Sequence, residues 1–195
     1  MANTDRGGGF RPVRHLNGMP WNGKATMYYT SDANALFMGD AVVSTGTADT
    51  SGKYASVTQA SAGGNIRGVV VGFSDQPYIA ADTSDKNRNY KAATDDLYVL
   101  VVDDPDVIFE IQEDNAISSL DADDVGICCD IAVGSGNTSS GASATKLDSS
   151  TTHATTAAQC KLLGVSNKED NALGDYCKWD VLIIEHEMRS STGVA

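Results

Sequence analysis

The stretch KAATDDLYVLVVDDPDVIFEIQ, residues 91–112, decides the fold class. It holds two apolar runs, 97–102 and 107–111, separated by the polar tetrad 103–106. Both runs are rich in β-branched and aromatic residues and have the length of a strand rather than of a helix. Pro105 lacks a backbone donor and disfavours the helical conformation in the residue before it, so one continuous helix is excluded. The pattern predicts a β-hairpin at the centre of an all-β domain.

The rest of the chain repeats this design of short apolar runs separated by turn residues. Its 195 residues include 19 glycines, and Gly, Ser, Thr and Asp fill the gaps between the runs. Many short strands joined by turns are typical of a sandwich or a barrel. We therefore predict an all-β fold, a β-sandwich or jelly-roll-like barrel of roughly nine to eleven strands. Besides the central pair, the expected strands are 25–30, 35–38, 41–43, 54–59, 66–73, 125–133, 160–165 and 179–188.

Three longer connections separate these strands. Residues 44–53 are expected to form a surface loop, with a tight turn at Gly39-Asp40 before it. Residues 74–95 are long for a connection without strands, and such loops are often functional. The low-complexity sequence GSGNTSSGASATKLDSSTTHATTAA, residues 134–158, predicts a long, exposed, hairpin-like excursion with one weak strand near 143–147.

By composition the chain divides into an extended basic N-terminal arm at 1–24, a β-rich domain at 25–188 and a flexible tail at 189–195. The arm has four basic residues and one acidic residue, a net charge of +3, which leaves −15 for the remainder (−12 − 3 = −15). Such an arm on an acidic body is expected to contact a neighbouring subunit or another acidic surface, and a disordered leader is the alternative. The candidate partner-binding residues are Phe10, Arg11, Arg14, His15 and Trp21.

The overall charge and the apolar pattern exclude two classes of partner. A net charge of −12 argues against direct binding of nucleic acid, which requires a basic surface. No apolar run approaches the ~20 residues that span a bilayer, so no membrane partner is expected. The first residues, MANTDRGGGF, lack the apolar core of a secretory signal, and cytoplasmic synthesis is expected.

The cysteines and histidines form no recognisable catalytic or metal-binding motif. Cys128, Cys129, Cys160 and Cys177 lack metal-ligand spacing, and buried, reduced thiols are expected, with an interchain disulfide as the alternative. Neither a histidine at ligand spacing nor a G-x-S-x-G motif is present. The histidines are His15, His153 and His186.

Two further patterns are weak candidates for ligand binding. The stretch GNTSSGAS, residues 136–143, has the glycine spacing of a P-loop but has Ala142 in place of the phosphate-binding lysine. The acidic clusters at 103–106 and 121–124 lack the spacing of an EF-hand, and solvated turns that block edge-to-edge aggregation explain them better. With 7% aromatic residues, no sugar cleft is indicated. We predict no catalytic residue, no metal and no cofactor.

Six blocks of the sequence, taken in order, resemble a group of tailed-bacteriophage virion proteins, the capsid cement or head-decoration proteins. The similarity extends over nearly the whole chain, and none of its blocks is a catalytic motif. The blocks are GFRPVRHLNGMPWNG, YYTSDANALFMGDAVV, IRGVVVGF, LYVLVVDDPDVIFEIQED, DDVGICCDIAVGSGNTSSGASATKLD and CKLLGVSNKEDNALGDYCKWDVLIIEHEM.

The resemblance implies a non-enzymatic structural protein on the capsid exterior, made in the host bacterial cytoplasm. Its expected partners are the phage major capsid protein, whose capsomers it would bridge, and neighbouring copies of itself in a dimer or trimer. A carbohydrate- or receptor-binding virion accessory protein, with residues 134–158 as the ligand face, is the first alternative. An enzyme with an unrecognised cleft is the second.

Overall fold

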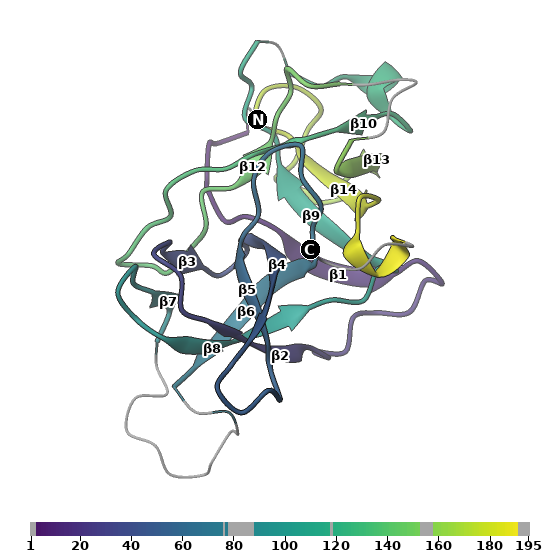
Figure 1. Ribbon diagram of the computed structural model, residues 1–195. Helices are drawn as coiled ribbons and strands as arrows, with labels where there is room; N and C mark the ends of the chain where they lie inside the picture. Colours follow the sequence, from purple (N-terminus) through teal and green to yellow (C-terminus); the bar gives the residue numbers. More distant parts are fainter. Residues whose placement is uncertain (1–2, 76, 78–87, 118, 153–157, 191–195) are drawn as a thin grey trace.

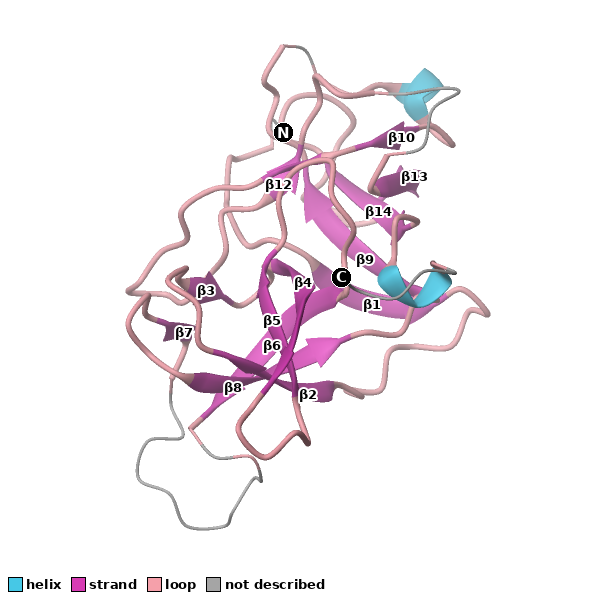
Figure 2. Ribbon diagram, viewed as in Figure 1, coloured by secondary structure: helices cyan, strands magenta, loops and turns pink. Residues whose placement is uncertain are grey.

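The computed structural model describes residues 3–75, 77, 88–117, 119–152 and 158–190, and within them the fold is all-β, as predicted. A closed five-stranded barrel packs against a five-stranded antiparallel sheet, an arrangement consistent with a β-sandwich (Figure 1; Figure 2). The strands are β1 (Arg11–His15), β2 (Thr26–Thr30), β3 (Leu36–Phe37), β4 (Ala41–Ala48), β5 (Ala55–Gln59), β6 (Gly68–Ser74), β7 (Tyr90–Lys91), β8 (Leu97–Val102), β9 (Val107–Gln112), β10 (Cys128–Cys129), β11 (Ile131–Ala132), β12 (Lys146–Leu147), β13 (Cys160–Val165) and β14 (Lys178–Ile183). Two 3-10 turns are η1 (Ala122–Asp124) and η2 (Glu187–Arg189).

The barrel has its own apolar interior. Its strand order is β2-β5-β4-β6-β8, and it closes through antiparallel pairing of β8 with β2 and a parallel contact between β2 and β5. Alternate residues of each strand point inward, so β8 contributes every second side chain. The interior residues are Tyr28, Leu36, Val42, Val57, Val70, Phe73, Leu97, Val99 and Val101.

A second core lies between the barrel and the sheet, whose strand order is β1-β9-β14-β13-β10. Neighbouring residues of one barrel strand supply both cores, because successive side chains of a strand point to opposite faces. Val70 lies inside the barrel, whereas Val69 packs against the sheet. In β8, Val101 and Val102 divide in the same way. This double coverage explains why the run 97–102 lacks polar alternation.

The predicted hairpin between 97–102 and 107–111 is wrong, although both strands are present. β8 pairs with β2 and β6 in the barrel, whereas β9 pairs with β1 and β14 in the sheet. The tetrad 103–106 is therefore the crossover between the two bodies. The local sequence specifies two strands and a break, but segments distant in sequence occupy both edges of each strand. A turn signal cannot reveal such pairing.

Several predicted boundaries also differ from the structure. β4 extends to Ala48, so the predicted loop 44–53 begins as a strand. Residues 125–133 form two short strands instead of one, with the interruption at Asp130. The carboxylate of Asp130 accepts a hydrogen bond from the backbone N–H of Gln159 at 3.1 Å. The last strand ends at Ile183. Half of the 74–95 connection (76 and 78–87), His153 and residues 191–195 lie outside the described residues, and the described part of the connection contains the short strand β7.

The low-complexity segment, described over residues 134–152, is exposed as predicted at 137–140 but packed at 141–149. From 141 to 149 every second residue is buried, and β12 pairs with β11. Ser143 N donates to Met38 O and Met38 N donates to Gly141 O, both at 2.9 Å. The strand predicted near 143–147 is thus present, but it is packed. Its buried residues are mostly small and polar, so hydrophobic periodicity does not detect them.

Asp40 anchors this segment to the barrel. Its side chain is fully buried. One carboxylate oxygen accepts hydrogen bonds from the hydroxyls of Ser143 and Thr145. The other accepts from Phe37 N at 2.9 Å and from Gln59 Nε2 at 3.3 Å. Burial raises the pKa of Asp40, and these donors act in the opposite direction.

The N-terminal segment crosses the predicted Gly39-Asp40 turn, which is present, at a contact that requires glycine. Phe10 N donates to Gly39 O at 2.9 Å. Gly9 has a φ of +62°, and a Cβ there would lie 2.3 Å from that same carbonyl oxygen. Gly39 has a φ of +93°, and its Cβ would lie 2.3 Å from Gly8 O. The backbones therefore touch, and the Phe10 side chain enters the second core.

The predicted extended arm is instead part of the folded body in its described portion. β1 is the edge strand of the sheet and pairs with β9. Phe10 is 1% exposed and packs edge-to-face on Phe109, with ring centroids 5.8 Å apart. The burial of Phe10 and the pairing of β1 with β9 stabilise this segment by more than the conformational entropy that the three preceding glycines lose on folding. No boundary between residues 24 and 25 separates arm from domain.

Replacing Gly9 with Ala is expected to lower the free energy of unfolding by about 2–4 kcal/mol, because the methyl group meets both a positive φ and a backbone oxygen. Gly18→Ala is the matched control. Gly18 has a φ of +88° but no atom within 4 Å of its added Cβ, so a loss of about 1 kcal/mol is expected. Urea denaturation measures both losses, and equal values would contradict the backbone contact.

Glu113, directly after β9, is a fully buried acid. Its Oε2 accepts a hydrogen bond from Leu120 N at 2.6 Å, whereas Oε1 has no partner within the described residues. Burial raises the pKa of Glu113 to about 7, and the charges of Asp114 and Asp175 raise it as well. The folded state therefore favours the protonated form of Glu113, because the ionised form would be a buried charge without a counter-charge.

The stability supplied by Glu113 is expected to be fully present below pH 4.5 and to be lost as the pH rises to about 7, since the folded state binds the extra proton over this window. The loss amounts to about 3 kcal/mol. Glu113→Gln keeps the shape and cannot ionise. The unfolding free energy of the variant relative to the native chain should increase by this amount between about pH 4 and pH 8. A difference independent of pH would refute the assignment.

Candidate partner-binding surface

His186, Cys129 and Cys160 are buried, and their surroundings are those of residues that stabilise the fold. His186 is 3% exposed, and its Nδ1 accepts a hydrogen bond from Met188 N at 3.1 Å, which caps η2. Burial lowers the pKa of His186 to about 4, and the nearby Arg67 lowers it too, so the imidazole is neutral near pH 7. Burial also raises the pKa of the Cys129 and Cys160 thiols, which makes them poor nucleophiles.

Neither a metal-binding cluster nor a membrane-spanning helix occurs among the described residues. No group of three or more His, Cys, Asp or Glu side chains in that part of the chain is placed to hold a metal ion. Within the same ranges, no helix has the length and apolar character needed to cross a membrane.

Two of the five predicted residues have acidic partners within their own chain. Arg14 Nη1 lies 2.7 Å from Asp180 Oδ2 on β14. His15 Nδ1 lies 3.4 Å from Asp104 Oδ2 in the crossover. The acidic complement that the sequence suggested on a neighbour is thus supplied in part by the body of the same chain.

The acidic crossover is partly solvated as predicted, since the side chains of Asp104 and Asp106 are exposed, but its carboxylates also accept hydrogen bonds from other elements. Asp103 accepts hydrogen bonds from Thr26 Oγ1 at 2.9 Å and from the Tyr28 hydroxyl at 2.7 Å. Asp106 accepts from Arg189 Nη2 at 2.8 Å. The tetrad therefore joins β2, the N-terminal hairpin and η2 at the junction of the two bodies.

Residues 11–21 form a hairpin at the edge of the sheet. His15 N donates to Met19 O at 2.7 Å, and Trp21 N donates to Val13 O at 3.1 Å. The return strand thus covers part of the outer edge of β1. In Figure 1 the turn of this hairpin lies at the periphery of the molecule.

The hairpin exposes apolar side chains. Val13 is 40% exposed, Leu16 54% and Met19 61%, and we call these three residues the hairpin surface. Single exposed apolar residues are ordinary, but three within seven residues on one projecting hairpin are typical of a contact site. Arg11, also exposed, forms no ion pair with any described residue.

Trp21, which is half-buried, lies between two pockets beside the hairpin. One pocket has a volume of about 240 Å³ and is lined by Trp21, His15 and the 55% exposed Met188, among others. The other has a volume of about 460 Å³ and is lined by Trp21, Met38 and Val71, among others. An apolar hairpin flanked by two pockets, with a tryptophan between them, has the composition of a protein-binding hot spot.

Sequence reasoning missed parts of this surface. Val13 alternates with Arg14 along β1 and gave a weak signal, because RPVRH contains no second apolar residue. Met188 and Met38 come from distant segments, and nothing local to them indicates that they lie near Trp21. Phe10 was predicted as a contact residue but lies in the core.

Comparison of the chain with models of protein families, with curated proteins and with solved structures finds no match in any of the three. The resemblance to phage head proteins therefore remains a prediction.

Phe10→Ala is expected to lower the free energy of unfolding by about 3–5 kcal/mol, because it opens a cavity between the sheet and the barrel. Arg14→Ala is expected to cost only about 0.2–1 kcal/mol, because its ion pair with Asp180 is partly exposed and screened by water. Denaturant titration of each variant and of the native chain measures both losses of unfolding free energy. Similar small losses for the two variants would indicate that the N-terminal segment is detached in solution.

Proposed function

We propose that the protein is a structural component of a bacteriophage virion that binds the outer surface of the capsid and bridges capsomers of the major capsid protein. The observation that carries the proposal is the hairpin surface beside Trp21, since exposed apolar residues around a tryptophan favour a protein partner. The ordered resemblance of the sequence to head-decoration proteins supports the same function. The proposal assigns no catalytic role to the chain.

The hairpin is well suited to bind without large rearrangement. Phe10 fixes its beginning in the core, the β1–β9 pairing fixes its first strand, and the Arg14–Asp180 ion pair holds its side. Leu16 N also donates to Asp106 O at 2.7 Å. A contact loop that is ordered before binding loses less conformational entropy when the complex forms.

Capsid stabilisation follows from this binding by mass action. A protein that binds only the assembled shell shifts the equilibrium toward the intact particle. An icosahedral surface offers many identical sites, so a dimer or trimer that engages two or three of them gains avidity from modest single contacts. We include self-association into such a homo-oligomer in the proposal.

A carbohydrate- or receptor-binding accessory protein is less well supported. Its expected ligand face was 134–158, and residues 141–149 of that segment are packed against the barrel and held by Asp40. The segment also contains no aromatic residue for stacking on a sugar. A glycan screen distinguishes this function from capsid binding.

The decisive experiment is co-sedimentation with capsids that lack this protein, using the native chain and the double variant Leu16→Asp/Met19→Asp. The two charges are expected to weaken binding at least about tenfold, because they must be desolvated at the apolar contact. A truncation that starts at Ala25 is unsuitable, since it would remove Phe10 from the core.

Ile117→Asp is the matched control, because Ile117 is 80% exposed and lies outside the hairpin. Loss of binding in the double variant alone supports the hairpin surface as the contact. Equal binding of all three chains would place the contact elsewhere. Absence of binding by the native chain would overturn the capsid function.

A further inference from the structure

A third pocket, of about 270 Å³, lies between the N-terminal segment, β9 and β14, on a different part of the sheet surface from the hairpin turn. Its lining is cationic, although the chain has a net charge of −12 and only 14 Lys and Arg residues. Two acidic residues, Glu110 and Asp170, also line it. The basic residues in the lining are Arg6, Arg11, Lys146, Lys168 and Lys178.

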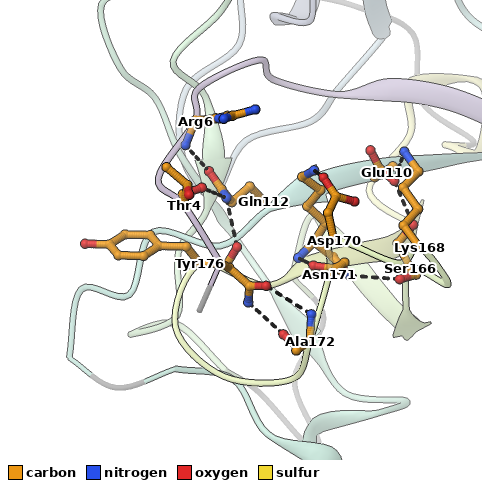
Figure 3. A network of polar contacts seen from close by, with 12 residues as sticks. Thr4, Arg6, Glu110, Gln112, Ser166, Lys168, Asp170, Asn171, Ala172 and Tyr176 are labelled. Atoms are coloured by element: carbon orange, nitrogen blue, oxygen red, sulfur yellow. Dashed lines mark hydrogen bonds and ion pairs between the residues drawn. The ribbon is translucent and has the colours of Figure 1, made fainter. Parts of the chain in front are cut away.

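The lysines of the pocket have carboxylate partners. Lys168 Nζ lies 2.6 Å from Glu110 Oε2, which also accepts a hydrogen bond from Ser166 Oγ at 2.7 Å (Figure 3). Burial raises the pKa of Glu110, but Lys168 and Ser166 outweigh it and hold the pKa below its usual value. Lys178 lies 3.7 Å from Asp170. Lys146 pairs with Asp5.

The two arginines differ from the lysines. Neither Arg6 nor Arg11 forms an ion pair with a residue that the structure describes. Arg6 is nevertheless held in place by its backbone, since Arg6 N donates to Gln112 Oε1 at 2.9 Å and Gln112 Nε2 donates to Thr4 O at 2.9 Å (Figure 3). The pocket thus presents two guanidinium groups that are not engaged in an ion pair with any described carboxylate, although Glu110 lies opposite Arg11 on the neighbouring strand.

The glycines between the arginines add hydrogen-bond donors. Gly7, Gly8 and Gly9 line the pocket, and their amide N–H groups donate no hydrogen bond to any described residue. Backbone amides without acceptors need a partner, and water or an anion can supply it. The two arginines and the three glycines thus line one and the same pocket.

We propose that this pocket binds an oxyanion group, a phosphate or a carboxylate, held by Arg6 and Arg11. The planar fork of a guanidinium matches both groups, and charge-assisted hydrogen bonds to it are among the strongest in proteins. The five cations exceed the two carboxylates of the lining by three, so a bound anion also relieves their mutual repulsion. The volume is several times that of one water molecule. The inference does not depend on the capsid function.

The test is an NMR titration of the full-length chain at constant ionic strength, with inorganic phosphate in one arm and a tetraglutamate peptide in the other. Binding is expected to shift the amide signals of Gly7, Gly8 and Gly9. Arg6→Gln and Arg11→Gln should each weaken it about tenfold or more. Lys161→Gln removes one exposed positive charge outside the pocket and should leave the affinity unchanged.

The two arms distinguish the source of the oxyanion. Saturable shifts with phosphate alone indicate a site for a free phosphate group, and shifts with the peptide indicate a site for protein carboxylates. The proposal is overturned if neither probe shifts the glycine amides, or if all three variants lose affinity equally. Unchanged amide signals elsewhere in the spectra confirm that the variants are folded.

Discussion

The fold depends on one crossing of three chain segments, at which the N-terminal segment, the Gly39-Asp40 turn and the 141–149 segment meet. Gly9 and Gly39 allow two backbones to touch, and the buried Asp40 carboxylate binds the third segment through hydroxyl donors. Apolar packing alone would not fix these segments, because the third has few large side chains to bury. The crossing therefore combines close backbone contact with a saturated polar group, which specifies position more strictly than hydrophobic contact does.

Both candidate binding sites depend on this crossing. Phe10 is the last residue before β1, and its burial determines where the chain lies on either side of it. Before Phe10, the glycine run places Arg6 at the cationic pocket; after it, β1 leads to the hairpin surface. The two sites therefore share a support but differ in chemistry, since one presents guanidinium groups and amides and the other presents exposed apolar side chains. Of the two sites, Arg6 belongs to the cationic pocket alone and Leu16 and Met19 to the hairpin surface alone, whereas Arg11 lines the cationic pocket and also one of the pockets beside Trp21.

The sequence predicted where most strands lie because apolar runs and turn residues are local signals. It could not predict which strands pair. Asp103 to Asp106 has the sequence of a turn between two paired strands. It instead connects the barrel to the sheet, because more distant strands pair with both edges of β8 and β9. The 141–149 segment was missed because its buried residues are mostly small and polar. Phe10 could not be assigned to the core from the sequence, because its position follows from the backbone contact between Gly9 and Gly39.

The crossover at 103–106 also has a consequence for synthesis. All residues of the inner barrel core lie between Tyr28 and Val101, so the barrel can close when little more than half of the chain has left the ribosome. The sheet cannot, because β1 pairs with β9, and β9 pairs in turn with β14 near the other end of the chain. Until then the edge of β9 that later pairs with β14 has no partner strand, which leaves it open to pairing with another chain.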